Sequence, residues 1–182
     1  MPNNSKSSYP DQVDGLFDRL DNLLEKKGTD STSLVISTDP IEYLDFSKAG
    51  NSTPFRVFGW DNPENDYTWT IGTEAYLLVP TRRCHSPLLL NVRLDSFRHD
   101  SISEQPVVIE ANRTEIAHWS VKNFGHYFAL IPSRFCTGKE LEVRFSIPEA
   151  CSPREVGAAD DDRQLGLRFE ALWISTADGV PV

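Results

Sequence analysis

The chain has 182 residues, of which 39% are hydrophobic, 10% aromatic and 25% charged, so it suits one domain with a sizeable core and is too apolar for wholesale disorder. The 27 acidic side chains outnumber the 18 basic ones and give a formal net charge of -9. Because nucleic acids and anionic membranes are bound through basic side chains, we expect no nucleic-acid partner and no attachment to an anionic bilayer.

The sequence contains no segment with the ~20 consecutive apolar residues that a membrane span requires, and the polar first residues are not followed by a signal-type apolar stretch. We therefore expect a cytoplasmic protein without a membrane span. The cysteines Cys84, Cys136 and Cys151 are widely spaced and include no C-x-x-C pair, which is typical neither of a disulfide framework nor of a zinc site. We expect buried thiols that act as small hydrophobic groups, and no metal or other cofactor.

The first predicted element is an amphipathic helix between Tyr9 and Lys27, where apolar residues recur every three or four positions. Acidic residues near its start and Lys26-Lys27 at its end suit the helix dipole, and Gly28 ends it. Its apolar stripe consists of Val13, Leu16, Phe17, Leu20, Leu23 and Leu24. Two roles remain open for this stripe: self-association into a homo-oligomer, or docking on the domain or on a larger partner.

After this helix the sequence changes to short strands separated by turns. The expected strands are 34–37, 41–46, 55–58, 67–71, 75–79, 88–96, 107–111, 115–121, 127–131, 141–147 and 167–174. The chain is accordingly divided into a leader with the helix at 1–28, a linker with the first strands at 29–54, a β-sandwich domain at 55–176, and a C-terminal tail at 177–182. Because the strand at 167–174 is the most apolar, we expect it to be central.

The turns between these strands define the fold class. Asn112-Arg113 stands at hairpin distance between two strands, and 122–125 stands between the next two. Pro132 and Gly138 frame one short helical turn. Many short strands without βαβ alternation predict an all-β fold, an antiparallel two-sheet sandwich with jelly-roll-like topology. The side chains expected in its core are Leu90, Val92, Val143, Phe145, Phe169 and Trp173.

The sequence contains no feature that positively indicates catalysis. There is no nucleophile elbow, P-loop, dinucleotide fingerprint or H-E-x-x-H motif. His118 and His126 are the only histidines close enough across a predicted hairpin, and their register is diagonal, so we expect surface or hydrogen-bonded roles. For the acidic triplet 160–162 a solvated turn, with Asp161 or Asp162 bonded to Arg163 or nearby backbone, is favoured over a calcium site. We expect a protein that is not an enzyme.

The segment 58–72 combines two tryptophans and a tyrosine with carboxylates and amides in a loop between strands. Aromatic faces stack on the C–H-rich faces of sugar rings, while carboxylates accept hydrogen bonds from hydroxyl groups. The alternative is that the tryptophans anchor the core and the polar groups solvate a bend. The expected ligand-binding residues are Trp60, Asp61, Glu64, Tyr67, Trp69 and Arg163, of which Arg163 supports the loop, more as a partner of Asp161 than as a ligand contact.

Three groups of residues form motifs that resemble those of a known protein family. The first, G-W-x-x-P-E followed by T-W-T-x-G, consists of Gly59, Trp60, Pro63, Glu64, Thr68, Trp69, Thr70 and Gly72. The last, S-P-x-x-x-G followed by D-x-R-x-L-G, consists of Ser152, Pro153, Gly157, Asp161, Arg163, Leu165 and Gly166. Between them, 107–110 and an N-R-T turn lead into Ile116 and Trp119.

Together these residues, across about 55–174, resemble the non-catalytic β-sandwich accessory domain of large bacterial glycosyltransferases that assemble surface polysaccharides. The resemblance implies a sandwich with a non-catalytic part in glycan handling near a glycosyltransferase partner. No transferase domain accompanies it here, which leaves two functions open. One is a glycan-binding accessory module, and the other is a scaffolding subunit that oligomerises or docks a glycosyltransferase through its N-terminal helix without binding sugar.

Overall fold

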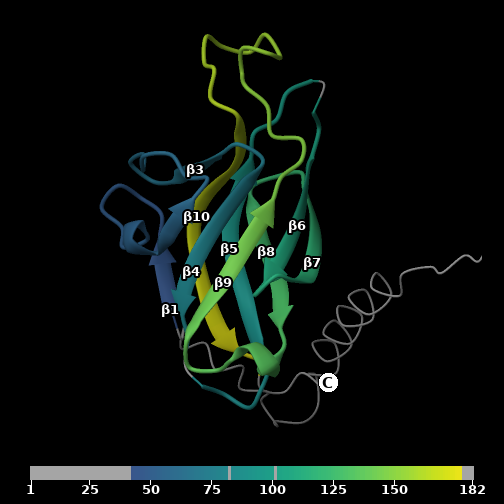
Figure 1. The fold of residues 1–182 in the computed structure, drawn as a ribbon. Helices are drawn as coiled ribbons and strands as arrows, with labels where there is room; N and C mark the ends of the chain where they lie inside the picture. The colour runs from purple at the N-terminus through teal and green to yellow at the C-terminus, as the bar shows by residue number, and fades with distance from the viewer. Residues whose placement is uncertain (1–41, 82, 101, 178–182) are drawn as a thin grey trace, which may run out of the picture. The chain divides into compact units, whose positions relative to one another are not determined.

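The computed structural model describes residues 42–81, 83–100 and 102–177. This part of the chain forms two antiparallel five-stranded sheets that pack face to face (Figure 1). The all-β sandwich predicted from the sequence is therefore confirmed. The predicted N-terminal helix, its apolar stripe and the strand expected at 34–37 lie outside the described residues. Within the described part, no helix is long and apolar enough to cross a lipid bilayer.

Sheet A contains the strand predicted to be central. Its strands are β1 (Glu42–Asp45), β3 (Thr68–Ile71), β5 (Leu88–Ser96), β8 (Gly125–Ile131) and β10 (Leu165–Thr176). β10 pairs with β5 along one edge, and along the other edge it pairs with both β1 and β3. Its apolar side chains have neighbours on both edges, which confirms the central position expected from its sequence.

Sheet B follows the order β2-β4-β9-β6-β7. Its strands are β2 (Arg56–Phe58), β4 (Glu74–Pro80), β6 (Gln105–Ala111), β7 (Thr114–Val121) and β9 (Glu140–Ser146). Two short 3-10 turns, η2 (Thr53–Phe55) and η3 (Ser133–Phe135), accompany the strands. The second of them confirms the helical turn expected between Pro132 and Gly138.

One of the two expected hairpins is present. Asn112 and Arg113 have φ angles of 46° and 63° and connect β6 to β7, which pair antiparallel. The hairpin expected around 122–125 is wrong, because β7 pairs with β6 in sheet B whereas β8 pairs with β5 in sheet A. A short connection fixes how near two strand ends are, but not whether the strands pair. His118 and His126 therefore belong to different sheets.

A β-bulge in β10 changes which residues face the core. The register of β10 against β5 shifts between Phe169 and Ala171, so the alternation of faces reverses beyond that point. Leu172 and Ile174 are completely buried in the core, whereas Trp173 is only half-buried. The prediction that Trp173 is a core residue is therefore wrong. The bulge places its ring on the outer face of sheet A.

The inner faces of the two sheets meet around a cluster of phenylalanine rings. Phe169 of sheet A lies 5.1 Å from Phe145 of sheet B and 5.2 Å from Phe46, measured between ring centroids. The other predicted core residues, Leu90, Val92 and Val143, are also fully buried. Because the inner faces are occupied in this way, any ligand surface of the described domain lies on an outer face or on the loops at its ends.

Candidate functional site

The loop between β2 and β3, which contains most of the predicted site, is fixed at its first residue. Gly59 has a φ of +78°, and a Cβ at this position would lie 1.8 Å from the carbonyl oxygen of Glu74. Only glycine fits this close approach. The Gly59 carbonyl accepts a hydrogen bond of 2.9 Å from the amide of Ile71, which closes the loop onto β3.

Trp60 points from this loop toward the core. Its indole lies 5.2 Å from the ring of Phe46 and 4.9 Å from the ring of Phe169. Its Nε1–H donates a 2.8 Å hydrogen bond to the carbonyl of Tyr76. With its ring packed on other rings and its polar group satisfied, Trp60 has the environment of an anchor between loop and core.

Asp61 and Arg163 form a clasp between two loops that are far apart in the sequence. The Arg163 guanidinium donates from Nη1 to Asp61 and from Nη2 to Asp161, the latter at 2.6 Å. The predicted pairing of Arg163 with Asp161 is thus present. Hydrogen bonds from the side chain and the backbone amide of Arg163 lower the pKa of Asp161 to about 2. The clasp fixes the β2–β3 loop against the connection between β9 and β10.

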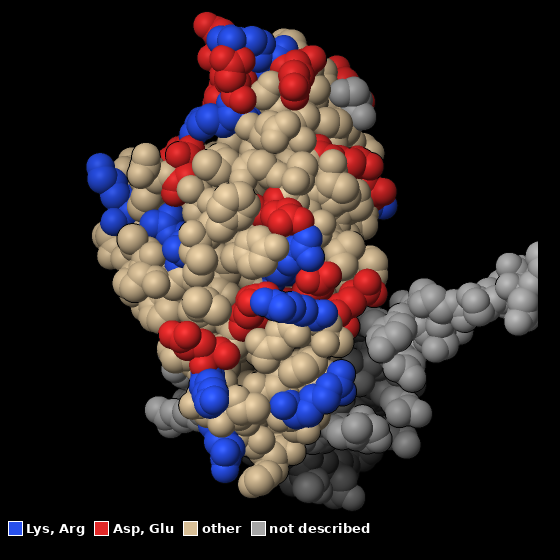
Figure 2. Space-filling model, viewed as in Figure 1, with Lys and Arg blue, Asp and Glu red and all other residues tan. Residues whose placement is uncertain are grey.

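The other two aspartates of the acidic triplet are also paired with an arginine. Arg154 forms ion pairs with Asp160 and, at 2.5 Å, with Asp162. Figure 2 shows acidic and basic side chains gathered together at the end of the molecule where this loop lies. Among the described residues, no group of three histidine, cysteine or carboxylate side chains is arranged to hold a metal ion. The triplet is an ion-paired turn.

Tyr67, Trp69 and Glu64 come together at the β3 side of sheet A. The two rings lie 6.0 Å apart and nearly perpendicular, at 82°, and both are partly exposed. A hydrogen bond to the Glu64 carboxylate, together with burial, raises the pKa of the Tyr67 hydroxyl. The guanidinium of Arg168 lies 4.8 Å from the centroid of the Tyr67 ring, and Arg168 stands opposite Trp69 in the β3–β10 pairing. We call these four residues the β3 cluster.

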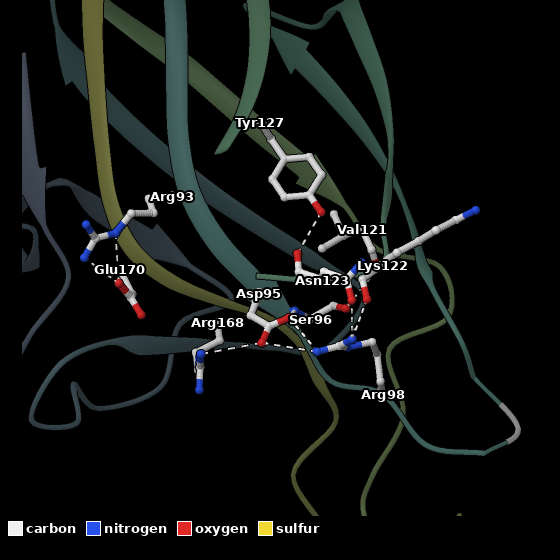
Figure 3. A network of polar contacts seen from close by, with 10 residues as sticks. All are labelled: Arg93, Asp95, Ser96, Arg98, Val121, Lys122, Asn123, Tyr127, Arg168 and Glu170. Atoms are coloured by element: carbon white, nitrogen blue, oxygen red, sulfur yellow. Dashed lines mark hydrogen bonds and ion pairs between the residues drawn. The ribbon is translucent and has the colours of Figure 1, made fainter. Parts of the chain in front are cut away.

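A polar network continues from the β3 cluster across sheet A (Figure 3). Asp95 of β5 pairs with Arg168 at 3.5 Å and with Arg98 at 3.1 Å, and Arg98 also donates to the carbonyl of Lys122. Beside it, Arg93 binds Glu170 through Nε at 2.9 Å and Nη2 at 2.6 Å. These contacts fix the orientation of the charged groups on the outer face.

Sequence reasoning missed a second aromatic group on the same face. Tyr43, Trp173 and Phe128 stand in one cross-strand row through β1, β10, β5 and β8, and His126 precedes Phe128 by two residues. The Tyr43 and Trp173 rings stack 6.4 Å apart, and His126 lies 5.7 Å from Trp173 and 6.5 Å from Phe128. Tyr43 is 50% exposed and Phe128 38%. We call these four residues the aromatic row.

That the two aromatic groups share one face of the sheet could not be predicted from the sequence. Tyr43 and Trp173 are far apart in the chain, and Trp173 faces outward only because of the bulge in β10. The available signal was the aromatic content of 127–128 and 173 at strand positions. The assumed alternation placed Trp173 in the core. In the structure, the aromatic row, the Arg93–Glu170 pair and the β3 cluster follow one another along a single sheet face.

No family model and no curated protein matches this sequence. Among solved structures, the chain is similar to the C-terminal CBM6 domain of a marine laminarinase from Zobellia galactanivorans, with 8% identity over 74% of this chain and 98% of that one and a TM-score of 0.44. It is also similar to the CBM22-1 xylan-binding domain from Paenibacillus barcinonensis, with 7% identity, coverages of 79% and 96%, and a TM-score of 0.43.

A third similar structure is the carbohydrate-binding module CBM36 in complex with calcium and xylotriose. The identity is 10%, the similarity covers 74% of this chain and 100% of that one, and the TM-score is 0.44. At these identities the likeness lies in the β-sandwich architecture alone.

Proposed function

We propose that this chain is a non-catalytic glycan-binding module whose ligand lies on the outer face of sheet A. The observation that carries the proposal is that partly exposed aromatic rings lie along that one face. Beside them lie charged side chains whose orientation is fixed by ion pairs. Aromatic rings provide large rigid contact areas at low entropic cost, which suits the apolar C–H face of a pyranose. The carboxylates and guanidinium groups supply acceptors and donors for its hydroxyl groups.

Within this face, Tyr67 is the stacking residue retained from the sequence, and Trp69, expected there as a ligand-binding residue, is a second stacking candidate. Glu64 is the acceptor beside them. Because the two rings are nearly perpendicular, one can stack on a sugar ring while the other borders its edge. Asp61 and Arg163 bond to each other and to Asp161, so we assign them to the support of the loop rather than to the ligand.

The proposal includes a biological setting that rests on the sequence resemblance. A glycan-binding sandwich of this kind would act as an accessory to the assembly of a bacterial surface polysaccharide, holding the polymer near a partner glycosyltransferase in the cytoplasm. The predicted stripe from Val13 to Leu24 would serve for docking that partner or for self-association.

The second candidate is a scaffolding subunit that binds proteins and no sugar. The observation that favours it is the environment of Trp60, whose ring packs on Phe46 and Phe169 instead of facing solvent. Under this alternative the aromatic face of sheet A covers a protein surface. The two functions differ in whether any carbohydrate binds to the isolated protein.

A glycan array followed by titration calorimetry on the best-bound oligosaccharide tests the proposal. Trp69→Ala should weaken binding by about 1–3 kcal/mol, by analogy with the stacking of bases on aromatic side chains. Phe58→Ala is the matched control, because Phe58 is 62% exposed on β2 of the other sheet. The melting temperature is measured in parallel for each variant. Absence of binding to every glycan would support the scaffolding function instead. Equal affinity of wild type and Trp69→Ala would contradict the assignment of Trp69 to the ligand surface.

A further inference from the structure

Isolated backbone hydrogen bonds join the two chain segments beyond the ends of β4 and β9. The last paired residues are Pro80 and Glu140, and the amide of Thr81 then donates a 3.2 Å hydrogen bond to the carbonyl of Lys139. Farther along, the amide of Cys84 donates a 3.3 Å hydrogen bond to the carbonyl of Cys136. This second hydrogen bond lies outside the regular β4–β9 ladder, and it brings the backbones of the two cysteines into direct contact.

In an antiparallel pair joined by backbone N–H···O=C hydrogen bonds, the Cα atoms of the bonded residues lie about 5.5 Å apart. A disulfide requires a Cα separation of about 4.4–6.8 Å, which such a pair provides. Burial and the neighbouring Cys84 thiol together raise the pKa of the Cys136 thiol. All three cysteines are free thiols in the structure, and the contact between Cys84 and Cys136 joins two residues that are 52 positions apart in the sequence.

The two thiols differ in accessibility. Cys136 is 3% exposed and lies directly after η3, whereas Cys84 is partly exposed in the β4–β5 connection. Cys151 lies beyond the opposite end of β9, where its amide and carbonyl bond to Leu165. Cys84 is thus the thiol that a dissolved reagent reaches first, and Cys136 is the thiol positioned to react with it.

We propose that Cys84 and Cys136 form an intramolecular disulfide by exchange with a small-molecule disulfide such as oxidised glutathione. The Cys84 thiolate attacks one sulfur of the oxidant, forms a mixed disulfide and releases one glutathione thiolate. The Cys136 thiolate then attacks Cys84 Sγ, forms the internal S–S bond and releases the second glutathione. Two protein thiols are oxidised, one glutathione disulfide is reduced, and the two cysteine protons pass to the released thiolates.

The bridge would connect the β4–β5 connection to η3, at the end of the sandwich where β5 begins. Its main effect is to restrict the unfolded chain by closing the long loop 84–136. For a domain of this size, we expect the melting temperature to rise by about 5–10 °C on oxidation. This proposal is independent of the proposed glycan binding.

The experiment exposes the full chain to a series of oxidised-to-reduced glutathione ratios, blocks the remaining thiols and maps tryptic peptides without reduction. Trypsin separates the three cysteines into the peptides 84–93, 135–139 and 145–154. We expect the first two peptides to be joined and the protein to lose the mass of two hydrogen atoms. Cys151→Ser is the control variant and should form the same bridge.

Two further variants test the order of the steps. Cys136→Ser should accumulate a glutathione adduct on Cys84, whereas Cys84→Ser should leave Cys136 unmodified, with circular dichroism verifying that each variant is folded. The peptide mapping of the wild-type protein uses neither variant, so the proposal is tested even if a variant does not fold. A persistent glutathione adduct on wild-type Cys84, a bridge to Cys151, or a bridge between two chains would each overturn the proposal.

Discussion

Trp60 allows a direct test of the difference between a structural anchor and a sugar-stacking residue. Replacement by alanine removes a ring that contacts Phe46 and Phe169 and breaks the 2.8 Å hydrogen bond to the Tyr76 carbonyl. Removal of a large core aromatic costs about 3–5 kcal/mol, and the lower end applies here because Trp60 is only partly buried. We therefore expect a loss of ~3 kcal/mol of unfolding free energy, or about 6–12 °C in melting temperature.

Urea unfolding followed by circular dichroism measures this loss for wild type, Trp60→Ala and Trp60→Phe. The phenylalanine variant keeps an aromatic ring in the core but removes the N–H donor, so it should lose about 1 kcal/mol. Calorimetry on a bound glycan is run on the same samples. If Trp60→Ala retains wild-type stability within ~0.5 kcal/mol and yet weakens glycan binding, the anchor assignment is refuted and Trp60 belongs to the ligand surface.

Three further predictions concern the core, the loop clasp and the N-terminal segment. Phe145→Ala should destabilise the sandwich by about 3–5 kcal/mol in urea unfolding, because the ring is fully buried against Phe169. In an NMR titration the Asp161 carboxyl should have its midpoint near a pKa of about 2, and Arg163→Gln should return it toward 3.8. Because folding lowers this pKa, the stabilising contribution of Asp161 is complete above about pH 4 and is lost as the pH falls toward 2; an unchanged midpoint in Arg163→Gln would contradict the clasp. Deletion of 1–28 should convert an oligomer into a soluble monomer by light scattering if the stripe self-associates, whereas lower solubility at unchanged mass would indicate docking.

The features that could be predicted from the sequence depend on neighbouring residues. The alternation from Leu141 to Phe145 identified β9 and its buried face, since side chains of a strand alternate with a period of two. Asn112 and Arg113 identified the β6–β7 turn because they stand at hairpin distance between two predicted strands, and asparagine adopts positive φ angles more readily than most residues. Pro132 and Gly138 likewise framed the short helical turn. These signals were sufficient for the strand positions and for the class of fold.

Features that join distant segments were decided only by the tertiary structure. The bulge in β10 turns Trp173 outward, and the periodicity of an isolated strand contains no information about an extra residue opposite its partner. The change of sheet between β7 and β8 separates His118 from His126.

The environment of the candidate site has the same dependence on distant contacts. Trp60 packs toward the core because Phe46 and Phe169 meet its ring. Cys84 meets Cys136 because the connections that follow β4 and precede β9 are joined by a backbone hydrogen bond. Local residue patterns determine which segments become strands and turns, whereas the pairing register and the packing of two sheets determine which side chains meet, and this choice depends on the free energy of the whole core.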